Sequence, residues 1–144
     1  MIGVQSKVQL KDESIRFGSK DQSGWELSVE EIRVIIEYTT EDGPFAPDHF
    51  LVFVNRSGTE YHLPLEAEGC LEVAEQVGKA LEADIDLKLS TSTNFASRVV
   101  FPDSIAGVEG YKLEKTKQTL TQRLFHLGQE VRMILSDEVR RSLS

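Results

Sequence analysis

Cysteine is almost absent from this chain of 144 residues, since Cys70 is its only one. A single thiol forms no internal disulfide, so we expect a fold that does not depend on oxidation. Long apolar runs are absent too, because none approaches the ~20 residues that a membrane helix needs. The first residues, MIGVQSKVQLKDES, lack the basic-then-apolar pattern of a secretory signal. These absences predict a cytoplasmic protein with no membrane partner.

Positive charge is also scarce. The chain has 16 Lys and Arg residues against 24 Asp and Glu, and its net charge is −8 with His neutral. Such a surface is repelled by phosphate backbones and by anionic lipid. The densest basic group is only Lys112, Lys115 and Lys117. We therefore expect no nucleic-acid partner, while a regulatory role toward a basic protein remains open.

The rest of the composition is that of an ordinary globular domain, with 40% hydrophobic and 28% charged residues. A domain of this length buries roughly two thirds of its unfolded surface, which is enough for a core without a metal or a disulfide. We expect residues 1–112 to form a sheet domain. Residues 113–144 should form a helix packed on that domain or on a partner.

Alternating polarity predicts the strands. In Glu31–Thr40, every second residue from Ile32 to Tyr38 is apolar, which is typical of a half-buried antiparallel strand. His49–Val54 is apolar on both faces, so we expect a central strand or one whose outer face is covered. The turn Asn55–Gly58 and the alternating stretch Thr59–Leu65 complete the clearest hairpin of the chain.

The hairpin brings two histidines into consideration. A turn centred on Arg56-Ser57 would place residue 51 opposite His62, so that His49 and His62 become diagonal neighbours on one face, roughly 7–8 Å apart. With Glu60 they could recruit zinc. The alternative is a pair of partly exposed histidines on the solvent side, and no HExxH or CxxC spacing supports a metal. We predict no metal, no cofactor and no catalytic residue, and keep His49 and His62 as a candidate pocket.

Three further features each have two interpretations. Phe45, between Pro44 and Pro47 in a loop that breaks the strands, is either an interaction anchor or a cap folded onto the core. The Ser90–Phe95 stretch is either a ligand loop or a solvated connection. Cys70, near a helix start, is either an activated nucleophile or a small buried apolar residue, and the sequence favours the second.

Helical spacing appears twice. Glu68–Ala83 carries an apolar stripe of Leu71, Ala74, Val77 and Leu81. From Leu113 to the end, a seven-residue repeat predicts a long helix, whose broad stripe favours packing on its own domain over a coiled-coil dimer. The candidate interface residues are Phe45, Leu120, Leu124, Leu127, Val131 and Ile134.

The strands within ELSVEEIRVIIEYTTEDGPFAPDHFLVFV and TEYHLPL, followed by an amphipathic helix, resemble bacterial proteins with pleckstrin-homology-like (PH-like) sheets. The similarity covers Ser6 to Ala83, and the chain departs from that class in residues 84–112 and in the final helix. The resemblance implies a curved antiparallel sheet plugged by a helix, and a binding or scaffolding module without catalytic residues. The basic loops that bind phosphoinositides in eukaryotic members are absent, so no lipid function carries over.

Together these features predict an α+β fold, with a bent antiparallel sheet (a PH-like half-barrel), an amphipathic helix and a long C-terminal helix. The leading hypothesis is a non-catalytic binding or assembly module that contacts another protein or its own copy as a homo-oligomer. The alternative is a small ligand-binding protein or enzyme, with a pocket near His49, His62 and the Ser90–Phe95 loop.

Overall fold

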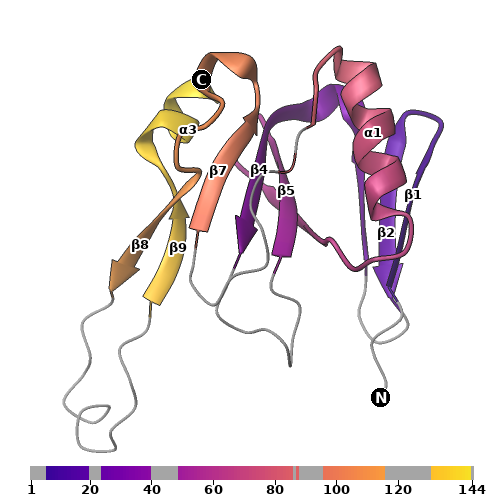
Figure 1. Ribbon diagram of the computed structural model, residues 1–144, viewed down its shortest axis with the longest axis horizontal. Helices are drawn as coiled ribbons and strands as arrows, with labels where there is room; N and C mark the ends of the chain where they lie inside the picture. The colour runs from indigo at the N-terminus through magenta and orange to yellow at the C-terminus, as the bar shows by residue number, and fades with distance from the viewer. Residues whose placement is uncertain are drawn as a thin grey trace, which may run out of the picture.

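Antiparallel strands dominate the computed structural model, which describes residues 6–19, 24–39, 49–85, 87, 96–115 and 131–143. The strands form three sheets that do not close into a barrel, with strand orders β1-β2-β3, β6-β5-β4-β7 and β8-β9. Figure 1 shows β4 and β5 between two flanks, with α1, β1 and β2 on one side and β7, β8, β9 and α3 on the other. The predicted α+β class is confirmed at this level.

The first sheet contains β1 (Ser6–Lys11), β2 (Ser14–Ser19) and β3 (Trp25–Ser28). Asp12 and Glu13 join β1 to β2, and both have positive φ, 53° and 63°. Two such residues fit the tight turn whose twist matches that of the flanking strands. The outer edge of β1 is covered where Val8 N donates to Glu68 O at 2.9 Å. A short 3₁₀ turn, η1 (Val29–Glu31), leads into the second sheet.

The second sheet contains β4 (Ile32–Thr39), β5 (His49–Asn55), β6 (Glu60–Pro64) and β7 (Ala96–Phe101). Phe50 pairs with Pro64 and Val54 with Glu60, so the predicted hairpin is confirmed as a pair of strands. The prediction of a covered central strand is also confirmed, because residues 51–54 are buried. The outer edge of β7 is partly covered, since Val99 N donates to Val108 O at 2.7 Å.

Strand β4 differs from the half-buried strand that its alternation predicts. All of its residues except Arg33 are buried, because both faces of the sheet are covered. Ile35 belongs to a core on the side of α1, whereas Val34 and Ile36 belong to a second core on the side of β8, β9 and α3. A bulge between Ile32 and Val34 moves Ile32 to the first core as well.

Helix α1 (Cys70–Leu81) covers the first core and confirms the helix expected over 68–83. Its buried side is rotated relative to the expected stripe. Ala74 and Val77 are buried as predicted, while Cys70 and Val73 are buried in place of Leu71. Leu71 itself is 65% exposed. The rotation arises because Cys70 and Val73 fill the space between the two sheets, and four apolar residues at helical spacing do not say which neighbour faces inward.

The prediction of one long C-terminal helix is wrong over residues 113–115 and 131–135, which form strands. Residues Tyr111–Lys115 form strand β8, which pairs with β9 (Val131–Leu135). Val131 and Ile134, two candidate interface residues, therefore lie in a strand. Leu120, Leu124 and Leu127, with Phe45 and the Ser90–Phe95 stretch, lie outside the described residues. Pairing with β8 overrides the helical repeat, and Val131 and Ile134 are β-branched residues that suit a strand.

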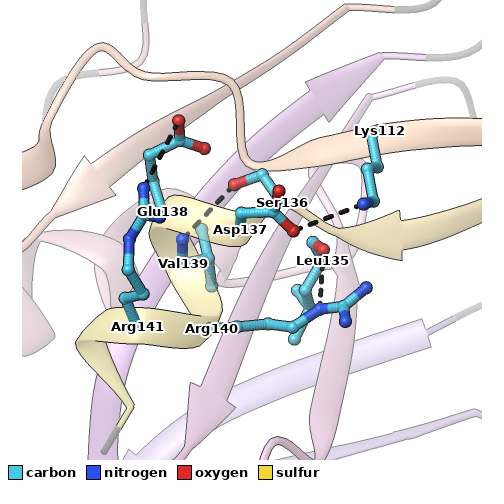
Figure 2. A network of polar contacts seen from close by, with 8 residues as sticks. All are labelled: Lys112, Leu135, Ser136, Asp137, Glu138, Val139, Arg140 and Arg141. Carbon is cyan, nitrogen blue, oxygen red and sulfur yellow. Dashed lines mark hydrogen bonds and ion pairs between the residues drawn. The ribbon is translucent and has the colours of Figure 1, made fainter.

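The only helical part of this region that the structure describes is α3 (Asp137–Ser142), shown with its polar contacts in Figure 2. Its cap is Ser136, whose Oγ accepts a hydrogen bond from Val139 N at 3.3 Å. Lys112 Nζ of β8 lies 3.3 Å from Asp137 Oδ1, and Arg140 Nε donates to Leu135 O at 3.1 Å. The helix is thus tied to both strands of the third sheet. No helix among the described residues has the length and apolar character to cross a membrane.

Candidate functional site

An open groove of about 860 Å³ runs beside α1. Its apolar lining contains Leu71, the large apolar residue that α1 leaves exposed. The helix, the segment that follows it and one residue of the 3₁₀ turn η2 (Asp103–Ile105) contribute to the groove. The lining residues are Leu71, Ala74, Glu75, Gly78, Lys79, Glu82, Ala83, Asp84, Ile85, Leu87 and Asp103.

The end of α1 shapes this groove. Glu82 adopts a left-handed conformation with φ 54°, and Ala83 N donates to Gly78 O at 2.8 Å. This is the hydrogen-bond pattern that commonly terminates a helix and reverses the chain. The reversal brings Ile85 back against the helix, where a Cβ at position 78 would lie 2.7 Å from Ala83 O and 3.1 Å from Ile85 Cγ1. Only glycine leaves room for this return, so Gly78 positions one wall of the groove.

The charges of the groove are mostly negative. In the part of the chain that the structure describes, four carboxylates line it, those of Glu75, Glu82, Asp84 and Asp103, together with one ammonium group, that of Lys79. All five residues are exposed. Lys79 Nζ lies 3.5 Å from Glu75 Oε1, one turn away on the same helix. Since this pair offsets one carboxylate, the remaining three give the groove a negative potential beside its apolar side chains.

The two histidines do not meet, which contradicts the expected arrangement. His62 pairs with Val52, one register position away from the expected partner, so His49 and His62 lie on opposite faces of the sheet. The turn causes the shift, because Asn55 N donates to Thr59 O at 3.1 Å and the loop therefore holds three residues, 56–58, instead of two. Gly58, with φ 87°, supplies the left-handed conformation that such a three-residue loop needs. The diagonal arrangement on one face that the sequence predicts for the two histidines is therefore wrong.

His49 instead joins a buried ionic cluster on the α1 side of the sheet. Its Nε2 lies 2.6 Å from Oε2 of Glu37, and Arg98 Nη1 donates to Oε1 of the same carboxylate at 2.7 Å. The Glu37 side chain is wholly buried, and those of His49 and Arg98 are 14% and 15% exposed. Both carboxylate oxygens are thus engaged by cationic or polar groups, which is the condition for keeping a charge inside a protein.

His62 belongs to a second polar cluster on the other face. Its Nδ1 lies 3.0 Å from Tyr38 Oη, and its Nε2 lies 3.6 Å from Glu60 Oε1. The hydroxyl of Tyr111 donates to the same Glu60 oxygen. Burial acts to raise the pKa of Glu60, but the hydrogen bonds from His62 and Tyr111 outweigh it and hold that pKa below its ordinary value. Burial, followed by the Glu60 carboxylate, raises the pKa of Tyr111, so its hydroxyl stays protonated and remains a donor.

The sequence did not identify most of these residues. A carboxylate at position 37 inside the apolar run VIIEY was a usable signal, since a charge in a strand covered on both faces requires a buried partner. Arg98 and Tyr111 carried no such signal, because their pairing depends on contacts distant in the chain. Cys70 is buried as favoured, and burial raises the pKa of its thiol to about 11. Within the described ranges, no group of three or more His, Cys, Asp or Glu side chains is arranged to hold a metal ion.

Comparison with known proteins gave no match, whether against family models, curated proteins or solved structures. The class of the protein is therefore defined by its own structure. It is an α+β protein of antiparallel sheets, and its described residues form an open groove beside helix α1.

Proposed function

We propose that this protein is a non-catalytic binding module that docks a segment of another protein in the groove beside α1. The observation that carries the proposal is the position of Leu71, which is 65% exposed and lines a groove of about 860 Å³. An isolated exposed leucine is ordinary on a protein surface. A leucine that borders a concavity of this size supplies apolar contact where a partner side chain can be enclosed.

The helix that forms one side of the groove is packed closely into the first core. Cys70, Val73 and Val77, on the opposite side of α1, are at most 2% exposed and pack into the first core. Glycine at position 78 allows the returning chain to press against the helix. A preformed site of this kind favours binding, because little conformational entropy is lost when the partner arrives.

The chemistry of the lining supports a binding role over a catalytic one. Among the described residues that line the groove there is no histidine, cysteine, serine, threonine or tyrosine. The ionisable groups of these described residues are exposed carboxylates and one lysine, none of them next to a nucleophile. A binding module without catalytic residues is also what the resemblance to PH-like proteins implies.

The partner that we favour is a different protein. Two copies of a chain with net charge −8 would bring like-charged grooves or surfaces together, which opposes association. Self-association through this face is the alternative, and the experiment below distinguishes it from docking of a different protein.

Site-specific photocrosslinking in the cells that make the protein tests the proposal. The photoreactive residue is placed at position 71, inside the groove, and in a matched variant at position 76. Gln76 is also exposed on α1 but does not line the groove. We expect an adduct with one distinct protein from position 71 and none from position 76.

Three results would count against docking. Equal adducts from both positions would show that the contact is not specific to the groove, and no adduct from position 71 would remove the docking role. An adduct whose mass is twice that of the chain would show that the groove binds a second copy of this chain and not a different protein. Light scattering on the purified protein checks that last outcome independently.

A further inference from the structure

We infer that the partner of the α1 groove is a segment that carries Lys or Arg residues on either side of one large apolar side chain. The inference rests on the proposed function, since it specifies what the groove takes. It depends on two sets of lining residues: the apolar ones Leu71, Ala74, Ile85 and Leu87, which we call the floor, and the acidic ones Glu82, Asp84 and Asp103, which we call the rim.

The floor is the reason why we expect the partner segment to carry a large apolar side chain. Leu71, Ala74, Ile85 and Leu87 line the groove, and three of these side chains are large. Burying apolar area at such a site provides most of the favourable free energy of association. Small or purely polar segments would leave this area in contact with water. The occupant therefore needs at least one side chain of the size of leucine or phenylalanine.

The rim is the reason why we expect Lys or Arg on either side of that apolar side chain in the partner. Glu82 and Asp84 border the groove just after the end of α1, and Asp103 borders it from η2. Carboxylates from separate segments thus border one concavity. Lys79, the one basic residue among the described residues of the lining, already lies next to Glu75. A basic segment would meet complementary potential, whereas an acidic one or a nucleic acid would be repelled.

Exposed ion pairs add little to affinity, so the charge of the rim should act mainly on the rate of association. This gives the inference a kinetic signature. Binding should weaken as salt screens the rim, with most of the change in the association rate. Removal of the apolar floor should instead speed dissociation, because contacts formed only in the complex are lost.

A displayed library of random peptides, selected on the full-length protein, provides the test. The same library is passed over the Leu71→Asp variant, and over Gln76→Asp as a matched control with the same added charge on the same helix. We expect the wild type and Gln76→Asp to enrich peptides with a large apolar residue flanked by Lys or Arg. The Leu71→Asp variant should fail to enrich them.

The outcomes separate the two claims. Peptides that depend on Leu71 but show no excess of Lys or Arg would leave the docking role in place and overturn the basic partner. Failure to enrich any peptide that depends on Leu71 would overturn both. An excess of basic peptides that bind Leu71→Asp equally well would show general attraction to an acidic protein, and would also overturn both.

Charge reversal then tests the rim directly with an enriched peptide. Asp84→Lys and Asp103→Lys should each slow association, and together by about tenfold at low salt. The matched control for each single reversal is Glu72→Lys, at an exposed residue of α1 outside the groove, which gives the same change in net charge. Equal slowing by Glu72→Lys would show that overall charge, not the rim, attracts the peptide.

Discussion

Glu37 and Arg98 form an ion pair of 2.7 Å inside the four-stranded sheet, directly across the ladder that joins β4 to β7. The carboxylate is wholly buried, and its second oxygen lies 2.6 Å from His49 Nε2 of β5. Side chains of three neighbouring strands therefore meet at one charge. A buried charge is stable only while its partners remain, so this cluster couples the ends of three strands.

Replacement of Arg98 by Met should destabilise the protein by about 3–5 kcal/mol, because Glu37 loses its cationic partner while staying buried. Urea unfolding followed by circular dichroism measures the loss. The matched control is Arg16→Met, which breaks an ion pair of 3.4 Å whose side chains are 44% and 59% exposed. That pair should contribute less than about 1 kcal/mol. A similar loss of unfolding free energy in the two variants would show that the buried ion pair contributes no more to stability than the exposed one.

The Glu37→Met/Arg98→Met double variant sharpens this comparison. Removal of both charges leaves no unpaired ion, so it should be less destabilised than Arg98→Met alone. The double variant is also compared with the single variants Glu37→Met and Arg98→Met. If its loss of unfolding free energy equals the sum of theirs, the two residues act independently and the coupling is absent.

Tyr111→Phe should raise the pKa of Glu60 toward its ordinary value of 4.5, because the carboxylate loses a hydrogen bond that stabilises its charged form. A carboxylate whose pKa is lowered on folding stabilises the protein above its unfolded pKa. That contribution is lost as the pH falls through the folded pKa. The variant should therefore be destabilised by about 1.5–3 kcal/mol at neutral pH and by less in acid.

Carbon-13 NMR of the Glu60 carboxyl group gives the pKa directly, and urea unfolding at neutral and acid pH gives the stabilities. Tyr61→Phe is the matched control, since Tyr61 neighbours Glu60 in β6 but lies on the opposite face of the sheet. An unchanged pKa in Tyr111→Phe would show that the hydrogen bond does not hold the charge of Glu60.

The sequence predicted the elements of the hairpin but not their register. The apolar run of His49–Val54 and the alternation of Thr59–Leu65 are local signals, and both are strands. The register depends on the loop holding three residues, with Gly58 in a left-handed conformation, and the polarity pattern does not encode that length. One residue of shift placed His62 on the face opposite to His49.

The prediction of a long C-terminal helix failed for a different physical reason. A seven-residue apolar repeat and a set of short strands place apolar residues at overlapping positions, so periodicity alone does not separate them. The strands form because β8 pairs with β9, with Leu113 opposite Met133, and the sequence gives no sign that these residues meet. The groove was unpredictable for a similar reason, because Asp103 reaches it only through the return of the chain along β7.

Gly110→Ala should destabilise the protein by about 1–3 kcal/mol through overpacking. A Cβ at this position would lie 2.4 Å from Cγ2 of Ile36, a wholly buried β-branched side chain with little freedom to move. Gly18→Ala is the matched control, since nothing lies within 4 Å of its added Cβ. Thermal unfolding of the two variants gives the comparison. The result that contradicts the packing is a Gly110→Ala protein as stable as Gly18→Ala.

Addition of Ile36→Ala to Gly110→Ala provides the internal check. The truncation makes room for the new methyl group, so the two losses should be less than additive. Fully additive losses would show that Gly110 and Ile36 do not contact each other.

The thiol of Cys70 should react with a disulfide reagent only as fast as the protein opens. The residue is buried, and its pKa of about 11 leaves little of the reactive thiolate at neutral pH. The Cys70→Ala/Leu71→Cys variant moves the thiol by one position, to a site where the native side chain is 65% exposed. That thiol should react at close to the rate of a small free thiol. A spectrophotometric assay measures both rates, and urea should make them equal.

This pair of rates also tests whether the groove is open in solution. If Leu71→Cys reacts as slowly as Cys70, position 71 is covered, either by the chain itself or by a second copy. Dilution separates those two cases, because only cover by a second copy is lost at low concentration. Fast reaction at all concentrations leaves the apolar floor accessible. Docking of a partner at Leu71 requires that accessibility, because a floor already covered offers a partner no apolar surface to bury.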